Sequence, residues 1–169
     1  EFEMAQLWVN LPAKDKKTPA RYQHLAKDNI TVVPLADDAG HARIIAGRFG
    51  NTDGAAETFT ELNVWDIVLN GGASADLDVP AGHNLMLVVL RGEVRINGGQ
   101  SVQASQMATF ERESGSVKVE AVGGEAKILL LSGVPIDEPV VGYGPFVMNT
   151  EAEIAEVMNE FRSGKFGAV

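Results

Sequence analysis

The fold is decided by residues 85–98, which read LMLVVLRGEVRING. A short apolar run, Leu85–Leu90, is followed by a segment in which Val94 and Ile96 alternate with charged residues. Alternation with a period of two is typical of a strand with one buried and one solvent-facing side. Asn97-Gly98 is a hairpin signal because both residue types tolerate a positive φ angle. The stretch therefore predicts two strands and a tight turn.

The same pattern extends from Ile30 to Leu131, where short apolar runs are separated by Gly, Asn, Asp or Pro. Many short strands with regular turns and no intervening helix are typical of a sandwich or jelly roll. We therefore predict an all-β fold of this class for residues 30–132. The predicted strands are Ile30–Val33, Ala42–Ala46, Val64–Leu69, Leu85–Leu90, Glu93–Ile96, Met107–Phe110, Ser116–Val122 and Lys127–Leu131.

Two flanking segments differ from this pattern. Residues 1–29 predict a strand at 6–11, ending at Pro12, and then a connecting arm without apolar periodicity. Residues 133–169 predict a Pro/Gly-rich strap followed by one helix. Thr150 and Glu153 form a capping box, and Gly164 is a natural stop. The helix carries an apolar stripe that we expect to pack on the domain, made of Ile154, Val157, Met158 and Phe161.

Composition narrows the class of protein. With 169 residues and a 45% hydrophobic content, the chain can bury a core. It has no cysteine, which excludes disulfides, zinc–thiolate sites and cysteine nucleophiles and agrees with a reducing, cytoplasmic location. Its apolar runs are too short to cross a membrane. The chain begins Glu-Phe-Glu-Met without an initiator methionine, so we expect it to start inside a longer protein.

The charge of the chain argues against nucleic acid as a direct partner. The formal net charge is −9. Acidic side chains are concentrated in residues 30–150, and this opposes contact with phosphates. The basic cluster Lys14–Lys17 is an exception, which we interpret as a solvated loop.

Three histidines, His24, His41 and His83, are the candidate metal ligands. A metal-binding jelly roll needs His-x-His on one strand face, a nearby carboxylate and a third histidine from a later strand. No histidine follows His83, and the positions that would share its strand face are apolar, namely Leu85, Leu87 and Val89. We therefore interpret the histidines as surface or turn residues. We predict no metal, cofactor or catalytic residue in this chain.

Other catalytic patterns are also missing. Ser132-Gly133 lacks the Gly-x-Ser-x-Gly context of a nucleophile elbow, and no phosphate-binding Gly-x-x-x-x-Gly-Lys occurs. Two carboxylate pairs are interpreted as solvent-facing, Glu111 with Glu113 and Asp137 with Glu138. Two tryptophans are expected to be core or interface anchors, Trp8 and Trp65.

Two long motifs resemble the pirin family. The first is QLWVNLPAK at residues 6–14, continuing to Arg21-Tyr22-Gln23. The second is GVPIDEPV at residues 133–140, running into YGPFVMNT at residues 143–150. Arg43-Ile44-Ile45-Ala46-Gly47, between them, is also similar to the second half of that family. The resemblance spans nearly the whole chain and identifies it as a C-terminal cupin half.

The resemblance implies a protein with two stacked cupin domains. Its N-terminal cupin would hold one divalent metal, with iron expected, through three histidines and a glutamate that are not in this sequence. Family members include quercetin 2,3-dioxygenase-like enzymes and a nuclear iron-binding transcriptional co-regulator. This chain would then be metal-free and supply scaffold and contact surface to the N-terminal cupin, in the same or a companion chain, with Gly133–Thr150 as an interdomain strap. The alternative is a non-enzymatic module that binds a protein or small molecule, in a cavity lined by Leu85, Leu87 and Val89.

Overall fold

The computed structural model of the protein describes residues 3–112 and 115–166. The chain divides into two compact units. Tyr22–Pro135 forms one, here called the sandwich unit, and Glu1–Arg21 together with Ile136–Val169 forms the other, here called the terminal unit. The predicted segment 30–132 falls within the sandwich unit. The two predicted flanking segments, 1–29 and 133–169, supply the terminal unit, except for the residues next to the sandwich.

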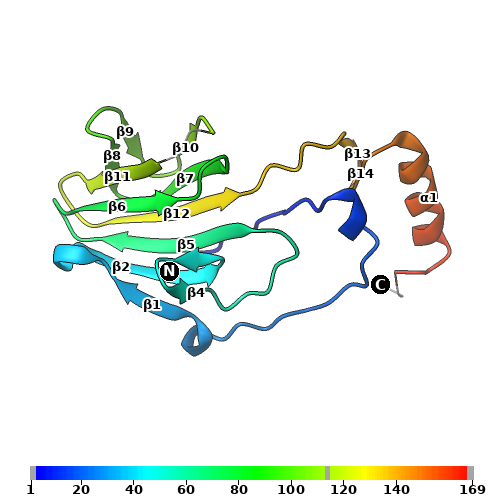
Figure 1. The fold of residues 1–169 in the computed structure, drawn as a ribbon, viewed down its shortest axis with the longest axis horizontal. Helices are drawn as coiled ribbons and strands as arrows, with labels where there is room; N and C mark the ends of the chain where they lie inside the picture. The colour runs from blue at the N-terminus through cyan, green and yellow to red at the C-terminus, as the bar shows by residue number, and fades with distance from the viewer. Residues whose placement is uncertain (1–2, 113–114, 167–169) are drawn as a thin grey trace. The chain divides into compact units, whose positions relative to one another are not determined.

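The larger sheet of the sandwich unit has six strands in the order β1-β2-β5-β12-β7-β10 (Figure 1). Every neighbouring pair in it is antiparallel. The apolar runs of the sequence supply these strands, because alternate residues of each run face the interior. Their bounds are β1 Thr31–Pro34, β2 Gly40–Ala46, β5 Leu62–Leu69, β12 Ala126–Gly133, β7 Asn84–Arg91 and β10 Met107–Phe110.

The smaller sheet has four strands in the order β6-β11-β8-β9. Asn97 and Gly98 adopt φ angles of 49° and 69° between β8 and β9, which confirms the predicted hairpin turn. A short β3–β4 ribbon lies outside both sheets. The bounds are β6 Ser74–Val79, β11 Gly115–Ala121, β8 Glu93–Ile96, β9 Ser101–Gln103, β3 Arg48–Phe49 and β4 Thr52–Asp53.

The core lies between the inward faces of the two sheets. Its fully buried side chains include Trp65, Ile44, Ile67, Leu69, Leu87, Val89, Ile128 and Leu130 from the larger sheet, and Leu77, Val94 and Val119 from the smaller one. The outward faces carry charged side chains, such as Arg95 on β8, which pairs with Glu120 on β11 at 3.2 Å. This arrangement confirms the predicted all-β sandwich.

All eight predicted strands of residues 30–132 are present, but the strand predicted at residues 6–11 is wrong. Residues 3–12 form no strand. A strand is held by hydrogen bonds to a neighbouring strand, and this segment pairs with no strand in the described part of the chain. Its Leu7, Trp8 and Val9 side chains are exposed.

The terminal unit contains a small hairpin and one helix. The hairpin pairs β13, Val141–Tyr143, with β14, Phe146–Met148, so the predicted strap is folded back on itself in its second half. The helix α1, Glu151–Arg162, contacts both strands. The unit also holds a single 3-10 turn, η1 Ala13–Asp15, whereas η2 Lys27–Asn29 and η3 Ala36–Asp38 belong to the sandwich unit.

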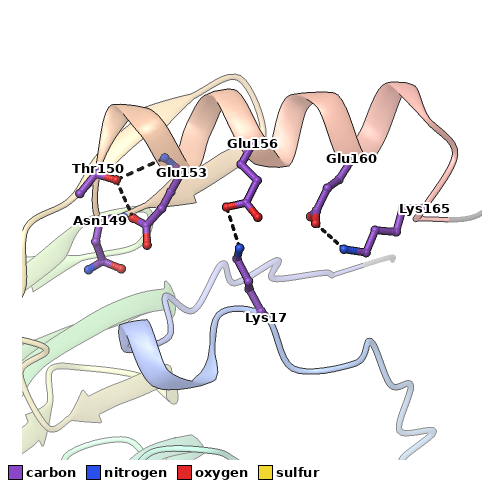
Figure 2. Close-up of polar contacts among 7 residues, drawn as sticks. All are labelled: Lys17, Asn149, Thr150, Glu153, Glu156, Glu160 and Lys165. Atoms are coloured by element: carbon purple, nitrogen blue, oxygen red, sulfur yellow. Dashed lines mark hydrogen bonds and ion pairs between the residues drawn. The ribbon is translucent and has the colours of Figure 1, made fainter.

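The predicted C-terminal helix and its cap are confirmed. Thr150 is the N-cap, and its hydroxyl oxygen accepts a hydrogen bond from the Glu153 amide at 3.2 Å. The Glu153 carboxylate in turn accepts a hydrogen bond from the Asn149 amide at 3.1 Å, and another from the Thr150 hydroxyl, which Figure 2 shows. Gly164, with a φ angle of 77°, follows the end of the helix. The burial of the apolar stripe decreases along the helix, because Ile154 near its start is buried whereas Phe161 near its end is half exposed.

No helix in residues 3–112 and 115–166 is both long enough and apolar enough to span a lipid bilayer.

Candidate functional site

His83 lies inside one end of the sandwich. Pro80 follows β6 directly and cannot continue its hydrogen-bond ladder, since proline has no N–H group. A turn at Ala81 and Gly82 then returns the chain to β7. His83 precedes that strand by one residue and is buried together with Leu85, the next position on the same face. Of the two interpretations of His83, the turn agrees with the hydrogen bond from its amide to the Pro80 carbonyl, whereas the surface position is wrong, because only 6% of its surface is exposed.

The two nitrogens of the His83 ring have different surroundings. Nε2 lies 3.7 Å from a carboxylate oxygen of Glu61, whose side chain is largely exposed. Nδ1 is buried and has no hydrogen-bond partner among the described residues. A buried polar group left without a partner costs about 1–3 kcal/mol in folding free energy. An ordered water molecule, an ion or a ligand can each supply the partner of such a group.

A cavity of roughly 200 Å³ adjoins His83. Its walls come from strand ends of both sheets, which meet at this end of the sandwich. It is open to solvent, and polar groups make up more of its accessible lining than apolar groups do. The lining residues are Val79, Pro80, His83, Leu85, Asn97, Phe110, Glu111, Gly115, Ser116 and Val117.

The interior beyond the cavity is filled by side chains. Leu87 and Val89, which the sequence suggested as cavity walls together with Leu85, are fully buried members of the core. Of the three, only Leu85 lines the cavity. The cavity therefore lies at the end of the sandwich, because large aliphatic side chains fill the middle of the sandwich.

The three histidines do not form a metal site within the described part of the chain. His24 is exposed in the segment before η2, and His41 lies on β2. No group of three His, Cys, Asp or Glu side chains in residues 3–112 and 115–166 is placed to hold a metal ion. The absence of a metal from this chain stays a prediction.

The side chains of Ser132 and Glu138 are both held by hydrogen bonds within the fold. Ser132 is buried, and its hydroxyl accepts a hydrogen bond from Asn63 at 2.9 Å. Glu138 accepts hydrogen bonds from the Ala13 amide at 2.7 Å and from the Asn149 side chain at 3.0 Å, so it joins the arm to the strap within the terminal unit. Asp137, its predicted pair, precedes β13.

The first carboxylate pair is only partly within the structure. Glu111 is exposed, as predicted, and it also contributes to the lining of the cavity next to His83. Glu113 lies outside the described residues. Sequence reasoning did not place Glu111 and His83 at the same cavity, since the two residues are on different strand ends and no local pattern relates them.

The two tryptophans differ sharply. Trp65 is a core anchor, as predicted, 1% exposed and with its ring edge-on to Phe49 at a centroid distance of 4.9 Å. Trp8 is not a core residue, because it is 73% exposed. It lines a shallow groove of roughly 290 Å³ in the terminal unit, with Val9, Asn10, Leu11, Lys16, Pro145 and Val147.

The basic cluster Lys14–Lys17 is partly engaged within the terminal unit. Lys16 donates hydrogen bonds to the Asn10 side chain and to the Val147 carbonyl. Lys17 pairs with Glu156 on α1 at 2.7 Å (Figure 2). This hydrogen bond raises the pKa of Lys17 and lowers the pKa of Glu156. Lys14 and Lys17 are exposed, as expected of a solvated loop, and the loop is in addition held by the contacts of Lys16 and Lys17.

Comparison with known proteins identifies the family. Residues 64–167 match the model of the pirin C-terminal cupin domain. The chain belongs to the pirin family. This confirms the resemblance that the two long motifs indicated.

Pirin-family relatives match nearly all of the chain. It is 45% identical to a Pseudomonas aeruginosa protein carrying the provisional name quercetin 2,3-dioxygenase, over 98% of this chain and 57% of that relative. It is 35% identical to a pirin-like protein of Caulobacter vibrioides, over 95% of this chain and 58% of the relative. The chain therefore spans little more than half the length of these curated relatives.

A solved structure has the same fold. The crystal structure of quercetin 2,3-dioxygenase from Acinetobacter baumannii superposes with a TM-score of 0.90 at 43% sequence identity. The match covers 95% of this chain and 56% of that one. The chain is therefore similar to one half of that protein.

Proposed function

We propose that this chain is the contact and scaffold half of a longer pirin-family protein, and that a metal-binding cupin domain is its partner, in the same or a companion chain. The observation that carries this proposal is the exposed apolar row Leu7, Trp8 and Val9. Its sequence has strand character, yet it pairs with no strand among the described residues. An apolar row with unpaired backbone groups is suited to pairing with a neighbouring domain.

The strap offers a second apolar surface in the same unit. Val140 and Tyr143 are 64% and 62% exposed, and Val147 lines the groove together with Trp8. Exposed apolar groups gathered in one small unit mark an interaction surface. The chain matches only 57% of the length of the first relative, and the rest of that length leaves room for a further domain in proteins of this family.

The activity of the whole protein is a proposal that rests on its relatives. Their names support quercetin 2,3-dioxygenase-type chemistry. We assign its divalent metal, with iron expected, to the partner cupin. The residues of this chain do not fit such an ion, because His83 has no second histidine beside it in the described structure and its recorded ionic neighbour is a single carboxylate, Glu61. We therefore assign no step of the reaction to residues of this chain. The lack of cysteine supports a cytoplasmic location.

Binding without catalysis is the second candidate function. The observation that favours it is the cavity beside His83, which lies wholly within the sandwich unit. This role is compatible with the first, since the terminal unit carries the proposed contact surface and the sandwich unit carries the cavity.

Fluorescence of Trp8 tests the proposed contact. The difference between the spectra of the unmodified protein and a Trp8→Phe variant isolates the Trp8 emission from that of buried Trp65. We expect Trp8 to be quenched readily by acrylamide in the 169-residue chain, and to be blue-shifted and protected in the longer protein that includes the metal-binding cupin. Equal quenching of Trp8 in both forms would show that the residue does not contact the partner domain.

A further inference from the structure

We propose that the edge of the sandwich formed by β9 and β10, here called the uncharged edge, is an interaction surface for a second copy of this chain. In this pairing β10 of one copy adds to β10 of the other in antiparallel orientation. The uncharged edge lies in the sandwich unit, whereas the proposed contact with a metal-binding cupin lies in the terminal unit. The two proposals are therefore independent.

The backbone of β10 has an open side. β10 is the last strand of the larger sheet, and its only neighbour there is β7. Just before β10, the Gln106 carbonyl accepts a hydrogen bond from the Val89 amide at 3.0 Å. Because hydrogen-bonded and non-hydrogen-bonded pairs alternate along an antiparallel ladder, Ala108 is the next residue bonded to β7. Met107 and Thr109 therefore direct their N–H and C=O groups away from β7, toward the free edge.

The edge at β10 lacks the protection that two other sheet edges have. Natural proteins keep sheet edges from pairing with other chains by placing proline or charged side chains on them. The edge strand β1 ends at the exposed Pro34, and the edge strand β6 carries the exposed Asp76 and Asp78. β10 has neither proline nor a charged side chain, and Met107 at its start is 56% exposed. This edge is therefore open to another strand.

The absence of charge extends beyond β10. Residues 97–110 contain no charged side chain, although 22% of the residues of the chain are charged and its net charge is −9. The same stretch supplies β9, the neighbouring edge strand of the smaller sheet, and both strands line one open, mainly polar groove of roughly 500 Å³. A high net charge keeps copies of a protein apart. Two copies of this acidic chain therefore repel each other least at the uncharged edge.

The side chains of the uncharged edge suit a copy of themselves. In a two-fold symmetric contact the same patch of both copies meets, so a charged side chain would lie close to its own like. Amides and hydroxyls both donate and accept hydrogen bonds, and so they can pair with their own kind. The exposed polar side chains here are all of these two types, namely Gln100, Ser101, Gln103, Ser105, Gln106 and Thr109.

The backbone of β10 is self-complementary as well. A two-fold axis at Ala108 places Met107 of each copy opposite Thr109 of the other. These are the two residues whose N–H and C=O groups point to the free edge, and opposed residues of an antiparallel pair exchange both hydrogen bonds. A second copy therefore supplies a partner for each open backbone group of β10.

Sedimentation velocity of the 169-residue chain over a concentration series tests the pairing. We expect a reversible equilibrium between monomer and dimer, and a weak one, because a single pair of edge strands gives a small interface. Added salt should strengthen the dimer, since it screens the repulsion between two acidic copies. A chain that stays monomeric up to roughly 1 mM would overturn the proposal.

Two matched variants locate the contact. Met107 and Val32 lie on the two opposite edge strands of the larger sheet, and they are 56% and 55% exposed. We expect Met107→Lys to weaken dimerisation roughly tenfold, because it brings like charges together across the two strands. Val32→Lys adds the same charge at the other edge and should not weaken the dimer. An equal effect of both substitutions would overturn the proposal.

Amide hydrogen exchange of the unmodified chain tests the pairing without a substitution. We expect exchange at Met107 and Thr109 to slow as the protein concentration rises, because their N–H groups become hydrogen-bonded only in the dimer. The Ala108 amide, which belongs to the ladder with β7, serves as the internal control. Concentration-dependent protection at Leu7–Val9 instead would place self-association in the terminal unit. That result would overturn this proposal and leave the contact proposed for the terminal unit standing.

Discussion

Arg43 on β2 donates a hydrogen bond to Asp66 on β5 at 3.1 Å, directly across the two paired strands. The Asp66 side chain is only 10% exposed, although it faces away from the core between the sheets. Lys127 on β12 approaches the same carboxylate oxygen at 3.9 Å. The carboxylate is therefore buried beneath two basic side chains on the outer face of the larger sheet.

Removing the arginine should destabilise the sandwich. Arg43→Met leaves a largely buried carboxylate without its hydrogen-bonded partner, and we expect the free energy of unfolding to fall by about 1–3 kcal/mol. Urea denaturation measures the change. Arg91→Met is the control, since Arg91 and Glu125 are both more than half exposed and such pairs contribute about 0–1 kcal/mol. An equal decrease in the free energy of unfolding in both variants would show that the burial of Asp66 does not strengthen its interaction with Arg43.

Asn63 connects three segments of the sandwich. Its side-chain oxygen accepts a hydrogen bond from the Arg48 amide at 2.8 Å, and its NH₂ group donates to Ser132 at 2.9 Å. Gly47 fits beside it because a Cβ atom there would lie 2.1 Å from the same oxygen. The Asn63 side chain thus fixes the bend between β2 and β3.

We expect Asn63→Ala to lower the free energy of unfolding by about 2 kcal/mol, because one buried and one partly buried hydrogen bond lose their partner. Thermal and urea unfolding of the variant measure this. Asn51→Ala, at an exposed turn position, provides the matched control with an expected change within about 0.5 kcal/mol. If the free energy of unfolding changes equally in Asn63→Ala and Asn51→Ala, water replaces the Asn63 side chain without a loss of stability.

The ion pair between Lys17 and Glu156 predicts a pH dependence within the terminal unit (Figure 2). The Lys17 hydrogen bond holds the pKa of Glu156 below its ordinary value of 4.5 and raises the pKa of Lys17 above 10.5. The Glu156 contribution is therefore present above pH 4.5 and lost as pH falls through its lowered pKa. The Lys17 contribution is present below pH 10.5 and lost as pH rises through its raised pKa.

We expect Lys17→Met to return the pKa of Glu156 toward 4.5, as followed by carbon NMR of its carboxyl group. Lys14→Met removes the same charge from the same arm without removing the hydrogen bond, and should leave most of the shift in place. A Glu156 pKa that is the same in Lys17→Met and in the unmodified chain would show that the contact does not persist in solution.

The sequence predicted the sandwich well because its signal is local. Alternation in Glu93–Ile96 and the Asn97-Gly98 turn depend on neighbours in the chain, and both are present as predicted. β6 was missed because Ser74–Val79 mixes small and acidic residues with a single large aliphatic one, Leu77. The segment at residues 6–11 was wrongly assigned because strand-forming residues become a strand only where a partner strand is present.

The candidate site was harder to predict. The sequence placed His83 next to a turn but gave no sign that its ring is buried. Phe110 and Ser116 line the same cavity as His83, although they come from strand ends far along the chain, so this neighbourhood exists only in the folded sandwich. The unpartnered Nδ1 is likewise a property of three-dimensional surroundings and has no signature in the order of residues.

Metal analysis tests the central claim most directly. Elemental mass spectrometry of the purified 169-residue chain and of the longer protein would give the number of metal ions per chain. We expect one divalent ion, with iron expected, in the longer protein and a substoichiometric content in the 169-residue chain. A stoichiometric ion in the 169-residue chain that is lost in a His83→Ala variant would contradict it.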